Sequence, residues 1–181
     1  LDDLLVLGRI KAFENERPNG VIIVDGPAAG HALDLVRAPV QLKRAIGSGP
    51  ISQQADEVLT MLSDSARCKV MLVTTAAITP VTETCEAADE LMEKSHIALA
   101  PIVVNKCNPD VPRVDDSILL PSSREAYHYL SLRAEAQSEA IAVLTDSLEQ
   151  PQLHLKQHHS DGTDLINAIA DDLEQTIRDL P

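Results

Sequence analysis

The 181-residue sequence is poor in aromatic residues, with no tryptophan, one phenylalanine and two tyrosines. Proteins that bind single-stranded nucleic acid need aromatic side chains on which bases stack, so the composition disfavours this class. Positive charge is also scarce: 15 lysines and arginines stand against 28 aspartates and glutamates, and the net charge is −13. Because phosphate contacts dominate nucleic-acid affinity and anionic lipids attract basic segments, we expect neither nucleic acid nor an anionic membrane surface as a partner.

Long hydrophobic runs are missing too. The sequence has no stretch of about 18 apolar residues, so we expect no integral membrane segment. It also shows no signal-peptide pattern. Its three cysteines, Cys68, Cys85 and Cys107, are odd in number and lie in or beside predicted core elements. This usage is typical of a reducing compartment without a disulfide framework, and we therefore expect a cytoplasmic protein.

Residues 21–31 are the most informative segment, with the sequence Val-Ile-Ile-Val-Asp-Gly-Pro-Ala-Ala-Gly-His. The β-branched run predicts a buried parallel strand over residues 20–25. Asp25 would then stand at the carboxyl end of the strand, where α/β proteins hold ligands and nucleotide hydrolases place the carboxylate that holds Mg²⁺. The small-residue turn that follows lets backbone N–H groups approach a phosphate. The alternative is that Asp25 only ends a strand and caps the next helix.

Hydrophobic spacing along the rest of the chain predicts alternating elements. We expect a helix over residues 53–66 with Ser52 as its N-cap, and a helix over 122–148 opened by the capping box Ser122-x-x-Glu125. The other expected helices cover residues 1–15, 31–37, 43–46 and 79–95, with a last one capped by Asp161 or Thr163. The expected strands cover residues 20–25, 69–75, 99–105 and 152–156. Strands that alternate with helices predict an α/β fold, a parallel sheet with crossover helices.

The order of these segments resembles the arsenite-pump and tail-anchored-protein-targeting ATPases, the anion-transporting ATPase family. Residues 25–32, Asp-Gly-Pro-Ala-Ala-Gly-His-Ala, and the Leu-rich stretch up to Pro39 are similar to the family's switch segment, Asp-Thr-Ala-Pro-Thr-Gly-His-Thr and a Leu-rich helix. Residues 1–5 resemble the helix before that strand. Residues 70–83 resemble the next strand and helix start, and residues 102–106 resemble the strand whose asparagine reads the base.

The resemblance implies a P-loop NTPase-like, three-layer fold with ATP and Mg²⁺ as cofactors. It implies that Asp25 holds Mg²⁺ through water, that the Gly30 N–H senses the γ-phosphate, and that His31 relays the switch motion or caps the helix. Asn105 and Lys106 would bind the base, and the loop with Pro151 and Leu153 would cover it. The sequence departs from the family at Gly26, Ala29 and Ala32, which replace threonines.

The residue types around Asn105 favour adenine over guanine. A side-chain amide offers a donor and an acceptor together, which suits an adenine edge. Residues 105–108, Asn-Lys-Cys-Asn, are similar to the Asn-Lys-x-Asp tetrad of GTPases, but Asn108 lacks the carboxylate that accepts from guanine. The alternative that Asn105 only terminates a strand stays open. His154, His158 and His159 suggest a metal site, although we favour solvated loop histidines.

The sequence contains no Gly-x-x-x-x-Gly-Lys-Ser/Thr loop. We therefore expect residues 1–181 to be a single domain, the C-terminal portion of a P-loop ATPase domain that is incomplete at its N-terminus. Residues 1–110 would hold the Walker B and base-reading segments, and residues 122–181 the C-terminal helices and the base-covering loop. The expected partner is the upstream, phosphate-cradling half of the same ATPase, in a homodimer or a heterodimer.

The expected function is that of an ATP-binding and ATP-hydrolysing switch protein that is inactive as this chain alone. The alternative is a non-catalytic nucleotide-binding or scaffold subunit of a hetero-assembly.

Overall fold

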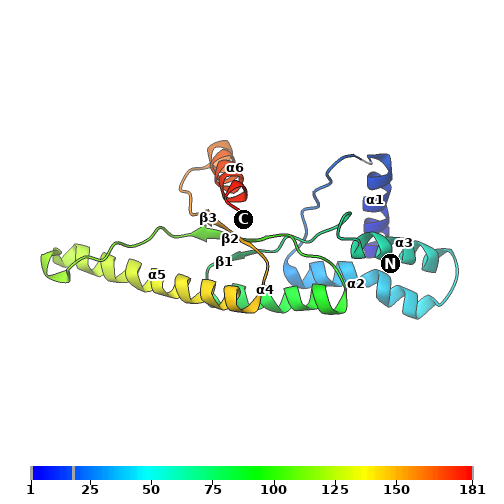
Figure 1. Cartoon of the computed structure of the whole chain (residues 1–181), viewed down its shortest axis with the longest axis horizontal. Helices are drawn as coiled ribbons and strands as arrows, with labels where there is room; N and C mark the ends of the chain where they lie inside the picture. Colours follow the sequence, from blue (N-terminus) through cyan, green and yellow to red (C-terminus); the bar gives the residue numbers. More distant parts are fainter. Residues whose placement is uncertain (1, 18, 181) are drawn as a thin grey trace. The chain divides into compact units, whose positions relative to one another are not determined.

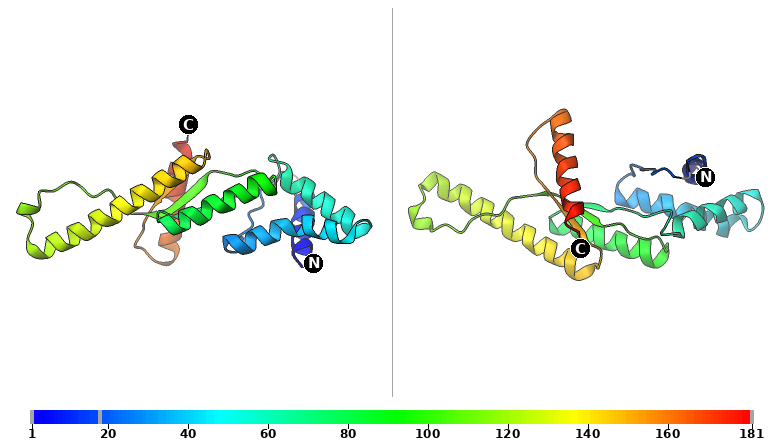
Figure 2. Two further views of the ribbon diagram at one scale, coloured as in Figure 1. Left: turned by 90° about the horizontal axis from the view of Figure 1, so that it is seen from below. Right: turned by 45° about the horizontal axis from the view of Figure 1, so that its top comes forward.

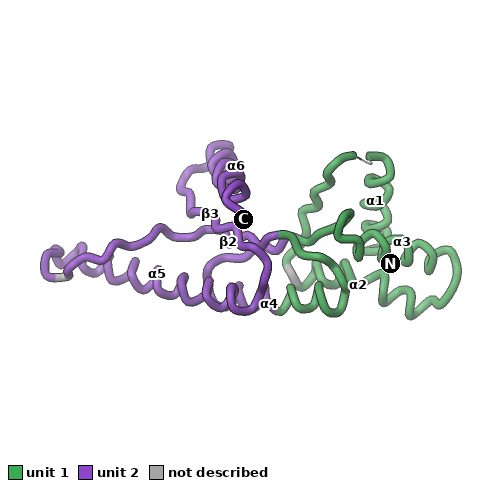
Figure 3. The backbone as a smooth tube through the Cα atoms, in the orientation of Figure 1, with its two compact units in different colours: residues 1–70, 86–100 green, residues 71–85, 101–181 purple. Residues whose placement is uncertain are grey.

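The computed structural model describes residues 2–17 and 19–180, and they form two compact units (Figure 3). Unit 1 comprises residues 1–70 and 86–100, and unit 2 comprises residues 71–85 and 101–181. The prediction that residues 1–181 form a single domain stays a prediction.

Unit 1 is built from helices. It contains α1 (Asp2–Glu16), α2 (Ala29–Ile46), α3 (Pro50–Ser63), the end of α4 (Ile78–Asp89) and the π-helical turn η1 (Glu90–Lys94). Its buried apolar side chains are Leu4, Leu7, Pro39, Ala55, Val58, Met61, Leu62, Ala87, Ala88, Leu91 and Ile97. The expected helix over residues 1–15 is confirmed as α1, although Leu1 lies outside the described residues.

Helix α2 runs through Pro39 without a break, so the prediction of separate helices over residues 31–37 and 43–46 was wrong. Proline lacks an N–H and its ring disturbs the preceding turn, which usually ends a helix. Here the Pro39 side chain is fully buried. Burial against the rest of unit 1 offsets the lost hydrogen bond, because tertiary packing overrides local propensity.

The predicted strand over residues 20–25 is not a strand in this structure. The segment is irregular, and Val21 and Ile23 are 91% and 89% exposed. A β-branched run becomes a strand only when a neighbouring strand satisfies its backbone groups. Within the described residues, no strand pairs with this segment.

The sheet of unit 2 has three parallel strands in the order β1-β2-β3, seen in Figure 1. They are β1 (Val73–Thr75), β2 (Ile102–Cys107) and β3 (Gln152–Lys156). This confirms an α/β fold with a parallel sheet and helical connections. The strand predicted over 152–156 is confirmed. The strand predicted over 69–75 is shorter, since only residues 73–75 form β1, and the strand predicted over 99–105 is shifted to residues 102–107. Val70 instead forms an isolated bridge to Leu99 in unit 1.

Helices cover both faces of this sheet (Figures 1 and 2). On one face, Ile169 and Leu173 of α6 (Gly162–Arg178) pack against the buried Val103, Leu153 and Leu155. On the other face lie α5 (Pro121–Ser147), with Ala140 and Leu144 buried, and the first part of α4, with Val81 buried. Unit 2 therefore has three layers, compatible with a three-layer α/β fold.

Prolines, not serine caps, begin two helices. Pro50 and Pro121 stand at the first turns of α3 and α5, with Gly49 and Leu120 as the N-caps. The predictions of Ser52 and Ser122 as caps were wrong because proline's fixed φ already suits the first helical position. Ser52 Oγ instead donates to the Gly47 carbonyl, 3.1 Å away.

The long helix predicted over 122–148 is confirmed, the one over 53–66 begins and ends three residues earlier, and the one over 79–95 ends as η1. A short 3₁₀ turn, η2 (Asp116–Ile118), precedes α5.

Among the described residues, every helix is too short or too polar to cross a lipid bilayer.

Candidate functional site

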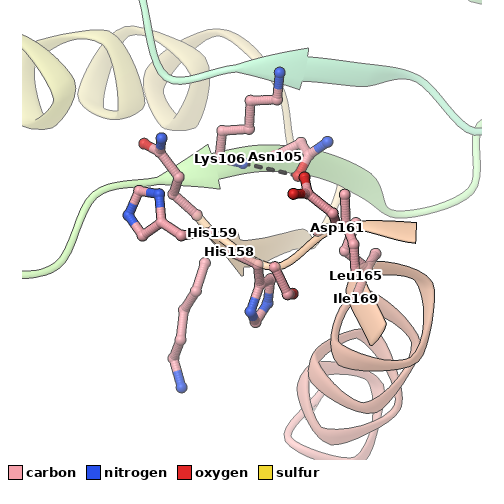
Figure 4. A pocket seen from close by; sticks show the side chains of 10 residues that line it. Asn105, Lys106, His158, His159, Asp161, Leu165 and Ile169 are labelled. Atoms are coloured by element: carbon pink, nitrogen blue, oxygen red, sulfur yellow. Dashed lines mark hydrogen bonds between the residues drawn. The ribbon is translucent and has the colours of Figure 1, made fainter. Parts of the chain in front are cut away.

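A pocket of about 310 Å³ lies at the carboxyl ends of β2 and β3 in unit 2. Ligands of parallel-sheet proteins bind at this end of the strands. Figure 4 shows the side chains around it: Asn105 and Lys106 from β2, the loop after β3, and Leu165 and Ile169 from α6. The full lining is Asn105, Lys106, Lys156, Gln157, His158, His159, Ser160, Asp161, Leu165 and Ile169. The pocket thus combines an amide, charged groups and two half-buried aliphatic side chains.

The side-chain amide of Asn105 is held by the backbone N–H of the next residue. The N–H of Lys106 donates to Asn105 Oδ1 at 2.8 Å, drawn as the dashed line in Figure 4. Lys106 adopts a left-handed conformation with φ of 58°, where the pairing of β2 with β3 shifts register between Val104 and Cys107. Because Oδ1 is engaged, the orientation of the amide is fixed. Its Nδ2 keeps two donors, and Oδ1 keeps a second lone pair.

Asn108 does not line this pocket. Its backbone N–H and its Nδ2 both donate to Gln137 Oε1, at 2.8 and 3.3 Å, and Gln137 Nε2 donates back to the Asn108 carbonyl at 3.2 Å. These bonds tie the start of the loop after β2 to α5. Asn108, which stands at the position of the GTPase aspartate, is therefore hydrogen-bonded to α5.

Pro151 and Leu153, predicted to cover the base, lie at the other end of β3. The Pro151 carbonyl accepts from the Ile102 N–H at 2.8 Å, at the beginning of β2. Leu153 is 1% exposed and belongs to the core with Val103. The structure therefore does not bring these two residues together with Asn105.

Residues 157–161, which follow β3, line the pocket instead. Sequence reasoning missed His158 and His159 as pocket residues, although one signal was present. Strand 152–156 was predicted, and the chain that leaves the carboxyl end of a parallel strand reaches the ligand edge of the sheet.

Asp172 of α6 fixes the beginning of this loop. Its Oδ2 accepts from the Lys156 N–H at 2.6 Å and lies 3.6 Å from His158 Nε2. The Gln157 N–H donates to the Cys107 carbonyl at 2.9 Å, which ties the loop to β2 as well. Burial raises the pKa of the Cys107 thiol, and the negative charge of Asp172 raises it further.

The histidines do not form a metal centre. His154 lies on β3, where Nε2 is 3.0 Å from Gln152 Oε1 and burial lowers the pKa of its imidazole. His158 and His159 line the pocket. Across the described part of the chain, no three histidine, cysteine, aspartate or glutamate side chains are grouped so that they could hold a metal ion.

Asp25, Gly30 and His31 belong to unit 1, whereas Asn105 and Lys106 belong to unit 2. Each group is therefore described by itself. Asp25 lies exposed in the irregular segment before α2. Among the described residues its carboxylate has no hydrogen-bond or ion-pair partner. Proteins commonly bind Mg²⁺ through one or two carboxylates together with water, and Asp25 would supply one such carboxylate.

Gly30 and His31 stand in the first turn of α2, which begins at Ala29. The N-cap residue Ala28 makes no side-chain capping bond, and the first turn contains no acidic residue. The N–H groups of such a turn are left open to an anion. A Cβ added at Gly30 would meet no atom within 4 Å, so the fold itself does not require glycine there.

No known family model matches the chain, and no curated protein sequence matches it.

Proposed function

We propose that the chain is the switch and base-reading portion of an ATPase with a P-loop NTPase-like fold, similar to the anion-transporting ATPases. In the whole protein it would bind Mg-ATP and couple hydrolysis to a conformational switch within a dimer. The chain carries no phosphate-cradling lysine loop, and stabilisation of the transferring phosphoryl group depends on such a loop. We therefore expect this chain alone to bind the base without hydrolysing ATP.

The observation that carries the proposal is the pocket with the locked Asn105 amide at the carboxyl end of the central strand. The free donors on Nδ2 and the second lone pair on Oδ1 match the adjacent acceptor and amino group of an adenine edge. Leu165 and Ile169 offer an apolar surface to the flat base. Asn108, which a guanine site would need as an acceptor, is held by Gln137.

For the motif in unit 1, taken by itself, the resemblance to the anion-transporting ATPases suggests roles at nucleotide phosphates. Asp25 would hold a water of the Mg²⁺ shell with its exposed carboxylate. Gly30 and His31 would present their N–H groups to an anion at the beginning of α2. Bound Mg²⁺ would neutralise charge that develops on the phosphates.

The test is a titration of the ¹⁵N-labelled chain with adenosine and with guanosine, followed by amide chemical shifts. We expect shifts in residues 105–107 and 157–161, tighter binding of adenosine, and a loss of about fivefold to 100-fold in affinity for Asn105→Ala, the effect of removing a buried hydrogen-bond partner. Asn167→Ala, an exposed asparagine of α6 outside the pocket, is the matched control and should bind as the parent chain does. Equal affinity for both nucleosides, or an unchanged affinity of Asn105→Ala, would remove Asn105 from the site.

One observation favours a second candidate, a non-catalytic nucleotide-binding or scaffold subunit. Gly26, Ala29 and Ala32 lack the hydroxyl groups that the resembled family places around the phosphates. The two candidates differ in phosphate release from Mg-ATP, measured in a longer polypeptide in which a lysine-bearing phosphate loop precedes this chain. Turnover that Asp25→Asn abolishes supports the ATPase. Nucleotide binding without turnover supports the scaffold.

A further inference from the structure

The pocket contains an interaction that the proposed function does not use. His158 Nε2 is enclosed and has no hydrogen-bond partner among the described residues. It faces Asp172 Oδ2 across 3.6 Å, beyond hydrogen-bonding distance. The Asp172 side chain is only 11% exposed, so its charge is poorly screened by water. An enclosed ring nitrogen opposite an enclosed carboxylate is an incomplete ion pair.

The same carboxylate already determines where the loop begins. Lys156 is the last residue of β3, and its N–H donates to Asp172 Oδ2 at 2.6 Å. Its Nζ lies 3.9 Å from Asp172 Oδ1. Two residues later the chain reaches His158. Asp172 of α6 thus contacts both ends of the segment Lys156–His158.

We propose that Asp172 is a positioning residue of this pocket, which holds the loop 157–161 through the Lys156 N–H and, when the imidazole is protonated, through His158. Protonation puts a positive charge on the ring beside the carboxylate, and closing the 3.6 Å gap by less than 1 Å makes a charge-assisted hydrogen bond. The loop then orders over the pocket. The ligand consequence, tighter base binding at lower pH, rests on the proposed function.

The charges around His158 come from four elements. The carboxylates are Asp172 of α6 and Asp161 of the loop, and the basic groups are Lys156 of β3, Lys106 of β2 and the neighbouring His159. Cys107 of β2 has a raised thiol pKa, so it stays neutral in the range where histidine titrates. The carboxylate of Asp172 lies 3.6 Å from His158 Nε2, so it is the group placed to accept a hydrogen bond from the protonated ring.

The test compares Asp172→Asn and His158→Gln with two matched controls in the full chain. Asp171→Asn changes the exposed neighbouring aspartate of α6, and His154→Gln changes an exposed histidine of β3 that lies outside the pocket lining. The first readout is the ¹H–¹⁵N heteronuclear NOE of amides 157–161 at pH 5.5 and pH 8. The second is the adenosine dissociation constant at the same two pH values.

We expect the parent chain and both controls to order the loop at pH 5.5 and to bind adenosine about threefold to tenfold more tightly than at pH 8, the range of a partly exposed ion pair. His158→Gln should keep its pH 8 behaviour at both pH values. In Asp172→Asn the heteronuclear NOE values of amides 157–161 should be low at both pH values, because the Lys156 N–H loses its charged acceptor.

Loop order and pH dependence that survive in His158→Gln or Asp172→Asn would overturn the inference. If Asp172→Asn does not fold, His158→Gln decides alone. If the parent chain binds no adenosine at either pH, the base-binding proposal fails, while the NOE values still decide the role of Asp172 and His158.

Discussion

The backbone N–H of Lys106 donates to the side-chain oxygen of Asn105 at 2.8 Å, and Lys106 itself has a positive φ of 58°. Both features stand at the same irregularity, where the pairing of β2 with β3 shifts register between Val104 and Cys107. The local irregularity at the end of β2 therefore fixes the amide that faces the pocket.

Replacement of Lys106 by glycine should relieve backbone strain without moving the amide. A left-handed conformation costs a residue with a Cβ about 1–2 kcal/mol, which outweighs the entropy that glycine adds to the unfolded chain, about 0.5–1 kcal/mol. We expect Lys106→Gly to be at least as stable as the parent chain in urea denaturation. His154→Gly, an exposed residue of β3 that pairs with Val104 before the register shift, is the control and should lose about 0.5–1 kcal/mol. Equal losses in both variants would show that Lys106 is not strained.

The exposed segment before α2 should tolerate polar residues. Val21 is 91% exposed, so Val21→Thr should change the free energy of unfolding of this chain by less than about 0.5 kcal/mol. The matched change Val58→Thr places a hydroxyl at a fully buried position of unit 1 and should cost about 1–3 kcal/mol. Chemical denaturation of the two variants measures both. A large loss for Val21→Thr would mean that this segment is buried after all.

Glycine at position 30 should matter for function and not for folding. A Cβ there meets no atom and Gly30 is helical, so Gly30→Ala should leave stability unchanged or raise it by up to about 1 kcal/mol. Gly47 at the end of α2 has a φ of 73°, and Gly47→Ala should cost about 1 kcal/mol. Thermal unfolding compares them. If Gly30→Ala destabilised the chain as much, the fold would explain this glycine without any phosphate role.

An ion pair in unit 1 gives a pH-dependent prediction. Arg67 Nε and Nη2 donate to the two carboxylate oxygens of Glu14 at 2.7 and 2.8 Å. This bond lowers the pKa of Glu14 below its usual 4.5. A lowered pKa means that the folded state holds the proton less tightly, so the pair stabilises unit 1 above pH 4.5 and the contribution disappears as pH falls through the lowered value.

Glu14→Gln should therefore reduce stability by about 0.5–1 kcal/mol at pH 7, and the difference from the parent chain should vanish towards pH 3. Glu16→Gln is the control, since Glu16 only approaches Arg9 at 3.9 Å on the exposed side of α1. Urea denaturation at both pH values supplies the comparison. A pH-independent difference for Glu14→Gln would contradict the ion-pair explanation.

Sequence patterns predicted the C-terminal part of the chain well because its signals are local. Residues 152–156 alternate between buried and exposed positions, and the apolar spacing of α6 places Ile169 and Leu173 on one side. Periodicities of this kind need no knowledge of distant segments. The place of Asn105 near the carboxyl end of β2 was predicted because it directly follows an apolar run, whereas its role at a base came from the family resemblance and stays a prediction.

The wrong predictions concern segments whose structure depends on contacts with distant parts of the chain. The run at residues 21–24 has strand propensity, but a strand needs a partner, and none of the described strands supplies one. Pro39 ends helices by itself, yet burial carries α2 through it. The loop 157–161 was noted only for its adjacent histidines, and only the direction of β3 shows that this loop reaches the pocket of Asn105 and that Pro151 does not.

Photolabelling with 8-azidoadenosine tests most directly the central claim, that an adenine base lies between Asn105 and the loop after β3. The labelled chain is digested and the modified peptides are identified by mass spectrometry, with adenosine and guanosine as competitors. The account predicts label within residues 105–107 and 156–161, removed by adenosine at lower concentration than by guanosine and much reduced in Asn105→Ala. Label concentrated at residues 150–153, or spread over the chain and insensitive to either competitor, would contradict it.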